Sequence, residues 1–241
     1  MRPEDTSVTE AFDVLKTYDW GSDRKALNPI DEAVVATRGD EAARAELEKK
    51  LLAALTGETS RSAKDYICRT LKTMGTAASA PALAALLPDE KLSHMARYAL
   101  ERIPAPEAAA AMRDALPKLP SKLKIGAIGS LGVRRDGASV APLAALLADS
   151  DGAVAAAAAN SLGVIGTAQS AAALTDAVKK ADDARRPAIA DACLACAESL
   201  LADGKKAQAV SLYNLLKGEG QSKHVRLAAT RGLLAAAGKK E

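Results

Sequence analysis

Aromatic side chains are scarce in this sequence, which has one Phe, one Trp and four Tyr among 241 residues. Because 49% of the residues are nevertheless hydrophobic, the core must be built from Ala, Leu, Val and Ile, which suit helices packed closely in pairs. No alternation of polar and apolar residues predicts a strand. No apolar run reaches the roughly 20 residues that a membrane-spanning helix needs. The sequence therefore predicts an all-α protein with no membrane partner.

Metal-binding side chains are also few, with three Cys and two His. Cys193 and Cys196 lie within an Ala- and Leu-rich segment predicted to be helical, Cys68 stands alone, and His94 and His224 are far apart in the sequence. A structural zinc site needs four ligands, and an odd number of cysteines argues against a disulfide framework. We expect buried, unreactive thiols and neither a metal nor another cofactor.

The charges nearly balance, with 33 Lys and Arg against 30 Asp and Glu. This balance and the lack of aromatic stacking platforms argue against a nucleic-acid partner. The opening segment, MRPEDTSVTEAFDVL, has neither the basic start nor the apolar stretch of a signal peptide. The compartment stays open: cytoplasmic as the sequence stands, periplasmic or secreted if a signal peptide has been removed.

The main positive feature is a repeat. Related segments rich in Ala and Leu begin at Ser79, Ala108, Ser139 and Ser170, so successive copies are 29, 31 and 31 residues apart. A period near 30 residues is typical of a solenoid, in which each unit contacts its neighbours. We expect a monomer.

Each copy has the same internal order of a short helix, a polar turn and a second helix. Pro81 and Pro142 fall in the first turn of a predicted helix, where a missing backbone N–H has no cost. The second helices have apolar residues about three, four and eight positions apart, which indicates burial along one side. Gly75 and Gly166 follow these helices and are predicted to be C-caps.

The pattern APxLxxLL, then Asp, then V-R-xx-A-xx-A-L-G-x-I-G runs from Ala141 to Gly166, and its second half recurs in HVRLAATRGLL from His224. On these motifs the sequence resembles HEAT-repeat proteins, including the Ala-rich bacterial and phycobilisome-lyase types, from about Ser60 to Gly238. The resemblance implies a right-handed α-solenoid of helix pairs. The arginine position that helps to join neighbouring repeats in such families varies here, which implies an incomplete Asp–Arg ladder: Lys64, Ser93, Lys124, Ala155 and Arg226.

Outside the regular repeats the pattern weakens, which predicts three segments. Residues 1–58 form an N-terminal helical cap, residues 59–183 the HEAT-like repeats, and residues 184–241 TPR- or HEAT-like helices that close the same solenoid. The helices expected in the two end segments are 8–18, 28–37, 40–55 with Asp40 as N-cap, 185–202, 205–217 and 222–237.

The resemblance further implies that the second helices line a concave face. Aligning them on Leu71, Leu100, Leu131 and Leu162 gives three rows that are expected to cross this face. Two residues before the leucine, the row is Arg69, Tyr98, Gly129 and Asn160. Three residues before, it is Cys68, Arg97, Ile128 and Ala159. One residue after, it is Lys72, Glu101, Gly132 and Gly163.

From these rows we predict a partner-binding surface of seven residues: Arg69, Lys72, His94, Arg97, Tyr98, Glu101 and Asn160. Truncation of Arg69 and Tyr98 is expected to change stability little, as at other exposed positions. A simply solvated face would explain these charges equally well.

The resulting hypothesis is a non-catalytic scaffold that binds a protein or peptide, with no catalytic residue. The alternative is an accessory module of a lyase or hydrolase system that processes a pigment or a carbohydrate, to which His94 or Tyr98 contributes. A closed pocket with convergent polar groups would favour the alternative, and an open groove the scaffold. A HEAT-like DNA glycosylase is a third hypothesis, which the missing aromatic platform disfavours.

Overall fold

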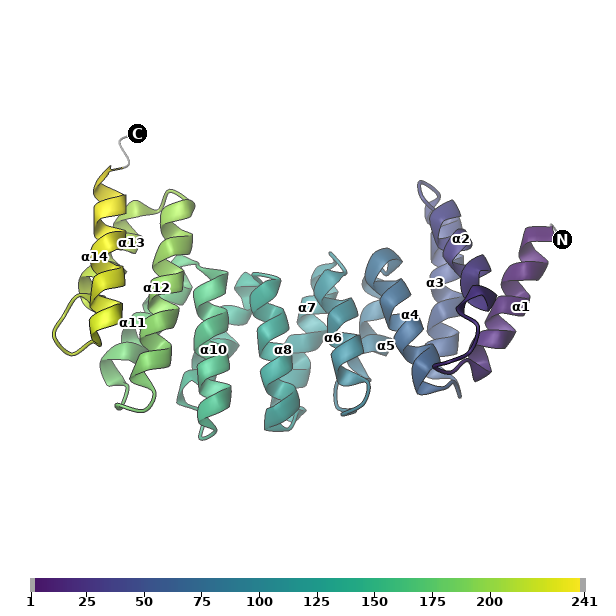
Figure 1. Ribbon diagram of the computed structural model, residues 1–241, viewed down its shortest axis with the longest axis horizontal. Helices are drawn as coiled ribbons and strands as arrows, with labels where there is room; N and C mark the ends of the chain where they lie inside the picture. The colour runs from purple at the N-terminus through teal and green to yellow at the C-terminus, as the bar shows by residue number, and fades with distance from the viewer. Residues whose placement is uncertain (1–2, 239–241) are drawn as a thin grey trace. The chain divides into compact units, whose positions relative to one another are not determined.

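The computed structural model describes residues 3–238, and side chains from Ser7 onward. This range contains fourteen α-helices, five short 3-10 helices and no β-strand (Figure 1). Within each of two compact units, helices close in sequence pack against one another, as in an α-solenoid of helix pairs. The predicted fold class is therefore confirmed.

The chain divides into two compact units, Met1–Leu119 and Pro120–Glu241. The boundary lies in the middle of the repeated region, so it does not coincide with the three segments expected from the sequence pattern. That sequence-based division stays a prediction.

The first unit contains seven α-helices. The second-type helices α4 and α6 pack against each other, and α3 packs against α4. The bounds are α1 (Pro3–Thr17), η1 (Arg24–Leu27), α2 (Asn28–Ala36), α3 (Glu41–Thr56), α4 (Arg61–Met74), η2 (Ala77–Ser79), α5 (Ala80–Ala84), α6 (Ser93–Arg102), α7 (Pro106–Ala115) and η3 (Leu116–Lys118).

The second unit contains seven more. Here α10 packs against both α8 and α12, and α12 packs against α14. The bounds are α8 (Ser121–Val133), η4 (Gly137–Ser139), α9 (Val140–Ala145), η5 (Leu146–Ala148), α10 (Gly152–Ile165), α11 (Ala168–Lys180), α12 (Arg186–Ala202), α13 (Lys206–Leu216) and α14 (Lys223–Gly238).

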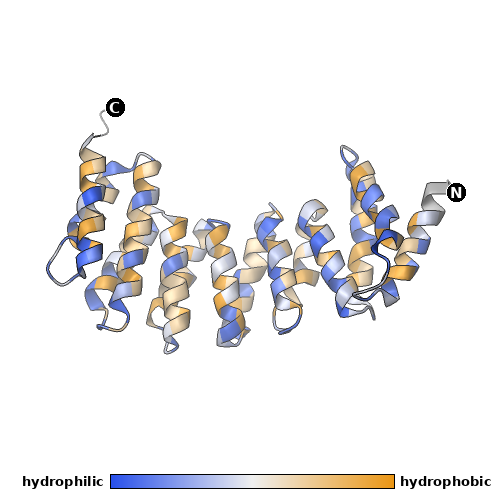
Figure 2. Cartoon of the chain, viewed as in Figure 1, coloured by the Kyte–Doolittle hydropathy of each residue, from blue (hydrophilic) through white to orange (hydrophobic). Residues whose placement is uncertain are grey.

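The core confirms the repeat register. All four leucines used to align the second helices, Leu71, Leu100, Leu131 and Leu162, are 0% exposed. Hydrophobic residues run along the helices beside hydrophilic ones (Figure 2), as one-sided burial requires.

The predicted caps are confirmed. Asp40 accepts a hydrogen bond from the Ala43 N–H at 2.9 Å and so caps α3. Gly166 ends α10 with a left-handed φ of 64°. Gly75 ends α4 at an ordinary φ of −60°, so the backbone conformation does not require glycine there. The available space does, because a Cβ at this position would lie 2.5 Å from the Leu71 carbonyl oxygen.

A buried carboxylate joins α3 to the start of the next helix pair. Glu48 is 3% exposed and accepts hydrogen bonds from the Thr76 N–H at 2.7 Å and from the hydroxyls of Thr76 and Ser79. Nearby, Arg44 Nε donates to the Met74 carbonyl at 2.6 Å. These bonds satisfy polar groups at the turn after α4, where a helix end would otherwise leave them unpaired.

Glycines allow close contact between second helices in the second unit. A Cβ on Gly132 of α8 would lie 2.7 Å from Ser161 Oγ of α10, and one on Gly163 would lie 2.7 Å from the Ala192 carbonyl oxygen of α12. Both glycines are buried. The prediction that they line a groove is therefore wrong, because their row faces the neighbouring helix.

Replacing Gly132 by Ala should lower the free energy of unfolding by about 1–3 kcal/mol, because the added methyl group overpacks the contact with Ser161. Gly129→Ala in the same helix is the matched control: no atom of a neighbouring helix lies within 4 Å of its added Cβ. The control should raise stability by up to about 1 kcal/mol, since Ala is the better helix former. Urea unfolding of both variants measures the difference, and equal effects would contradict the close helix contact.

Candidate functional site

Only one of the three predicted rows contains no buried residue. Arg69 and Asn160, two residues before the aligned leucines, are exposed, and Tyr98 is half-buried. A residue in that position lies about 160° around the helix from the buried leucine, whereas one three positions before lies only about 60° away. In that latter row the prediction of a surface is wrong for Cys68, Ile128 and Ala159, which are buried.

In the first unit, α4 and α6 bring Lys72 and Tyr98 together. Lys72 Nζ lies 4.7 Å from the centroid of the Tyr98 ring and 3.3 Å from its hydroxyl oxygen. Such a cation–π contact fixes both side chains before any partner binds. Two predicted residues from adjacent second helices therefore form a pair that neither helix contains alone.

The remaining predicted residues of this unit lie on α6. Arg97 Nη2 is 3.3 Å from His94 Nδ1, and burial lowers the pKa of Arg97 while the Glu101 carboxylate opposes that change. Glu101 is half-buried, 3.7 Å from Arg102. Asn160 is exposed on α10 of the second unit.

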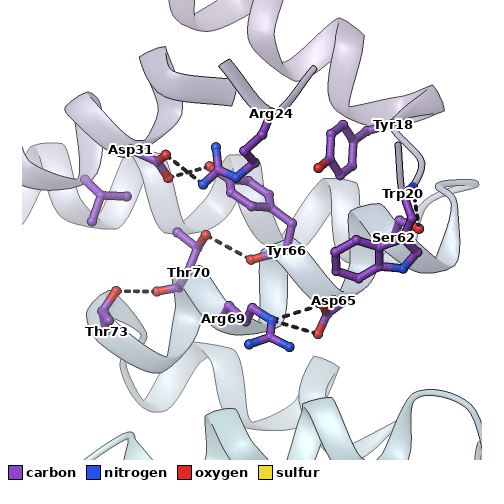
Figure 3. A pocket seen from close by; sticks show the side chains of 11 residues that line it. Tyr18, Trp20, Arg24, Asp31, Ser62, Asp65, Tyr66, Arg69, Thr70 and Thr73 are labelled. Atoms are coloured by element: carbon purple, nitrogen blue, oxygen red, sulfur yellow. Dashed lines mark hydrogen bonds and ion pairs between the residues drawn. The ribbon is translucent and has the colours of Figure 1, made fainter. Parts of the chain in front are cut away.

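A pocket that the sequence did not reveal lies in the first unit, between the segment after α1, α2 and α4 (Figure 3). Its volume is about 550 Å³. It is lined mainly by aromatic rings and by two Arg–Asp pairs: Tyr18, Trp20, Arg24, Asp31, Asp65, Tyr66 and Arg69.

Trp20, the only tryptophan, is 64% exposed although its backbone is held in place. The Trp20 backbone N–H donates to Asp19 Oδ1 at 2.8 Å and to Ser62 Oγ at 3.3 Å. The Ser62 hydroxyl in turn donates to the Asp19 carboxylate at 2.6 Å. Ser60, the N-cap of α4, donates its hydroxyl to the Tyr18 carbonyl. These bonds from Ser62 and Trp20 lower the pKa of Asp19.

On the opposite wall, Asp31 of α2 accepts from two donors. Arg24 Nη2 lies 2.8 Å from one oxygen, and the Tyr66 hydroxyl donates to the other at 2.9 Å. The Arg24 guanidinium also stacks 4.8 Å from the centroid of the Tyr66 ring. Burial, together with the Asp31 charge, raises the pKa of Tyr66, so its phenol stays protonated.

The second pair joins Arg69 to Asp65, one turn earlier in α4. Arg69 Nε lies 3.1 and 3.0 Å from the two carboxylate oxygens, and the Asp65 side chain is only 2% exposed. Truncating Arg69 would leave a buried carboxylate without this partner, which is costly. The expectation that such a truncation changes stability little is therefore revised.

One signal in the sequence could have indicated this pocket. The only tryptophan follows Tyr18 within a polar turn, where an apolar ring has no place in a core. The sequence pattern places this turn in the N-terminal cap, and nothing in it pairs the turn with α4.

The structure offers little for metal chemistry. Within residues 3–238, no group of three or more His, Cys, Asp or Glu side chains could hold a metal ion. All three cysteines are buried as predicted, and burial raises the pKa of Cys68 and Cys193 to about 12 and that of Cys196 to about 11. No helix in the described range is both long and apolar enough to span a membrane.

Part of the repeated region matches a known protein family. Residues 114–195 match a family model described as HEAT repeats. Residues 114–195 are therefore HEAT repeats, and the helix pairs of each unit are consistent with that family. No curated protein matches the sequence.

Two crystal structures of engineered proteins from a structural genomics consortium are similar to the chain. The first has 19% identity and a TM-score of 0.43 and covers 97% of this chain and 69% of its own. The second has 19% identity and a TM-score of 0.31 and covers 98% and 97%.

The acid sensitivity of the Trp20 turn follows from Asp19. A carboxylate with a lowered pKa contributes its stabilisation above the ordinary value of 3.8 and loses it as the pH falls through the lowered value. Tryptophan fluorescence anisotropy should therefore stay constant from neutral pH and fall with a midpoint below 3.8. Circular dichroism in parallel separates this local change from unfolding, and Asp19→Asn should abolish the transition. A midpoint at or above 3.8 would contradict the bonding described here.

The buried thiols should react slowly in the native protein. Because the thiolate is the reactive form and burial raises the thiol pKa, a disulfide reagent should label Cys68, Cys193 and Cys196 quickly only after denaturation. Zinc added in stoichiometric amount should leave the Tm unchanged. Rapid native labelling or stabilisation by zinc would mean that these thiols are accessible.

Proposed function

We propose that this HEAT-repeat protein is a non-catalytic scaffold that binds a protein or peptide partner. HEAT repeats are typically interaction scaffolds. The binding surface, which we call the α4–α6 face, comprises the six predicted residues of the first unit: Arg69, Lys72, His94, Arg97, Tyr98 and Glu101. Exposed Asn160 on α10 is proposed as a contact of the second unit in the same role.

The observation that carries this proposal is the Lys72–Tyr98 pair. An aromatic ring and a cation are held together across two helices at a solvent-accessible position. Interface hot spots are enriched in Trp, Tyr and Arg, and side chains fixed in advance lose less entropy on binding. Trp20 and Arg69 add the other favoured residue types to the same unit.

The bonding within the pocket supports a scaffold over the accessory-enzyme alternative. Asp31 is bonded to Arg24 and Tyr66, and Asp65 is bonded to Arg69. These carboxylates pair with neighbours and do not converge on a common point where a substrate could react. Because the pKa of Tyr66 is raised, this phenol is also a poor base at neutral pH.

A display library of short random peptides, selected on the immobilised protein, tests the proposal. Peptides enriched on the wild type should bind in solution, and the double variant Lys72→Gln, Tyr98→Ala should weaken that binding roughly tenfold or more, because both hot-spot side chains are lost. Lys49→Gln, an exposed position on α3, is the matched control and should bind normally.

Circular dichroism and thermal unfolding verify that both variants keep the fold. If selection enriches no peptide, or if the enriched peptides bind the folded double variant as tightly as the wild type, the α4–α6 face is not the binding surface.

A further inference from the structure

We infer that the Trp20 pocket and the adjoining α4–α6 face recognise an acidic peptide segment, with an apolar side chain entering the pocket and a carboxylate binding at Arg69 and Lys72. This inference rests on the proposed function and assigns its ligand class. It concerns the first unit alone.

The pocket can accept an apolar side chain because several of its polar groups are already bonded to one another. Asp31 accepts hydrogen bonds from Arg24 and Tyr66, and the Thr70 hydroxyl donates to the Tyr66 carbonyl at 3.0 Å. The Thr73 hydroxyl donates to the Thr70 carbonyl at 2.8 Å. An apolar group that displaces water here therefore leaves these groups paired, whereas unpaired ones would oppose binding.

Trp20 supplies the apolar contact surface. Its side chain is 64% exposed at the pocket while the backbone of its turn is bonded to Asp19 and Ser62. Burying this ring against a ligand removes apolar surface from water without first ordering the loop. The pocket should therefore bind a Leu-, Met- or Phe-like side chain most favourably.

Arg69 gives the site its preference for a carboxylate. Only its Nε is bonded to Asp65, and neither terminal nitrogen makes a bond to that carboxylate (Figure 3). The side chain is 62% exposed. Terminal guanidinium nitrogens match a carboxylate well, so Arg69 can bind a ligand without releasing Asp65.

Lys72, one turn later on α4, extends this positive surface because its ammonium group lies against Tyr98. Together α4 and α6 contain six Arg or Lys and two Asp or Glu. These two packed helices thus carry a larger net positive charge than the +3 of the whole chain. On the face itself, the three cations Arg69, Lys72 and Arg97 outnumber the one carboxylate, Glu101, which favours an acidic segment.

A peptide fits this surface better than a nucleic acid. Asp19, Asp31 and Asp65 lie in or beside the pocket. A continuous phosphate backbone would meet these carboxylates, whereas a peptide can place one acidic residue at Arg69 and an apolar residue against Trp20.

The test uses the same display selection with a library that lacks tryptophan, so that Trp20 is the only fluorophore of its kind. Enriched peptides should be acidic and contain a large apolar residue. Their binding should shift Trp20 emission to shorter wavelength, and Trp20→Ala should weaken it roughly tenfold. Leu234→Ala, an exposed apolar residue in the second unit, is the control and should have no effect.

A double-mutant cycle tests the charge. Because Arg69 alone cannot be removed without stranding Asp65, both are neutralised in Asp65→Asn, Arg69→Gln. Converting the peptide's Asp and Glu to Asn and Gln should weaken binding to the wild type roughly tenfold, and much less to this variant or to Lys72→Gln. Binding to the wild type should also weaken as salt rises.

Basic or neutral enriched peptides, unchanged Trp20 emission, or equal losses in every arm of the cycle would overturn the inference while leaving peptide binding to the α4–α6 face intact. Oligothymidylate bound more tightly than the peptides, with the affinity lost in Lys72→Gln, would assign the face to nucleic acid and overturn it too. An empty selection would instead contradict the proposed function.

Discussion

The distance at which one second helix can approach the next governs each unit of this protein. A core with almost no aromatic rings can fill its interior only if helices come close together, and the second unit meets that requirement with Gly132 and Gly163. At these positions even a methyl group would collide with the neighbouring helix. The repeat thus needs its smallest residues at defined offsets. The low aromatic content and the close helix packing both follow from this need for helices to approach closely.

The two units meet this requirement with different side chains. Where α8 and α10 have glycines, the equivalent positions on α4 and α6 carry Lys72 and Glu101, which are half-buried. In the first unit a cation and a tyrosine ring therefore occupy part of the space between second helices. The first unit accordingly contains the Lys72–Tyr98 contact, and it also contains Trp20 and two Arg–Asp pairs.

The sequence predicted the repeats, the helices and the buried leucines, because periodic apolar positions report directly which side of a helix is buried. It predicted the surface rows less well. Residues at three different offsets from the aligned leucine were all expected on one face, although successive residues are rotated by about 100° around a helix. That rotation buries Cys68 and exposes Arg69, its neighbour. The Trp20 pocket depends on Asp19 and Ser62, 43 residues apart in sequence, and no local pattern announces such a contact.

Buried and exposed positions alternate around the aligned leucine of a second helix, and this arrangement has an evolutionary consequence. On α8 and α10 the residues three before and one after the aligned leucine are buried, whereas Arg69 and Asn160, two before their leucines, are exposed. A substitution at that single position can change what one repeat presents without altering how the repeats stack, provided that any buried partner such as Asp65 changes with it. Repeats of this kind can therefore acquire new specificities one residue, or one ion pair, at a time.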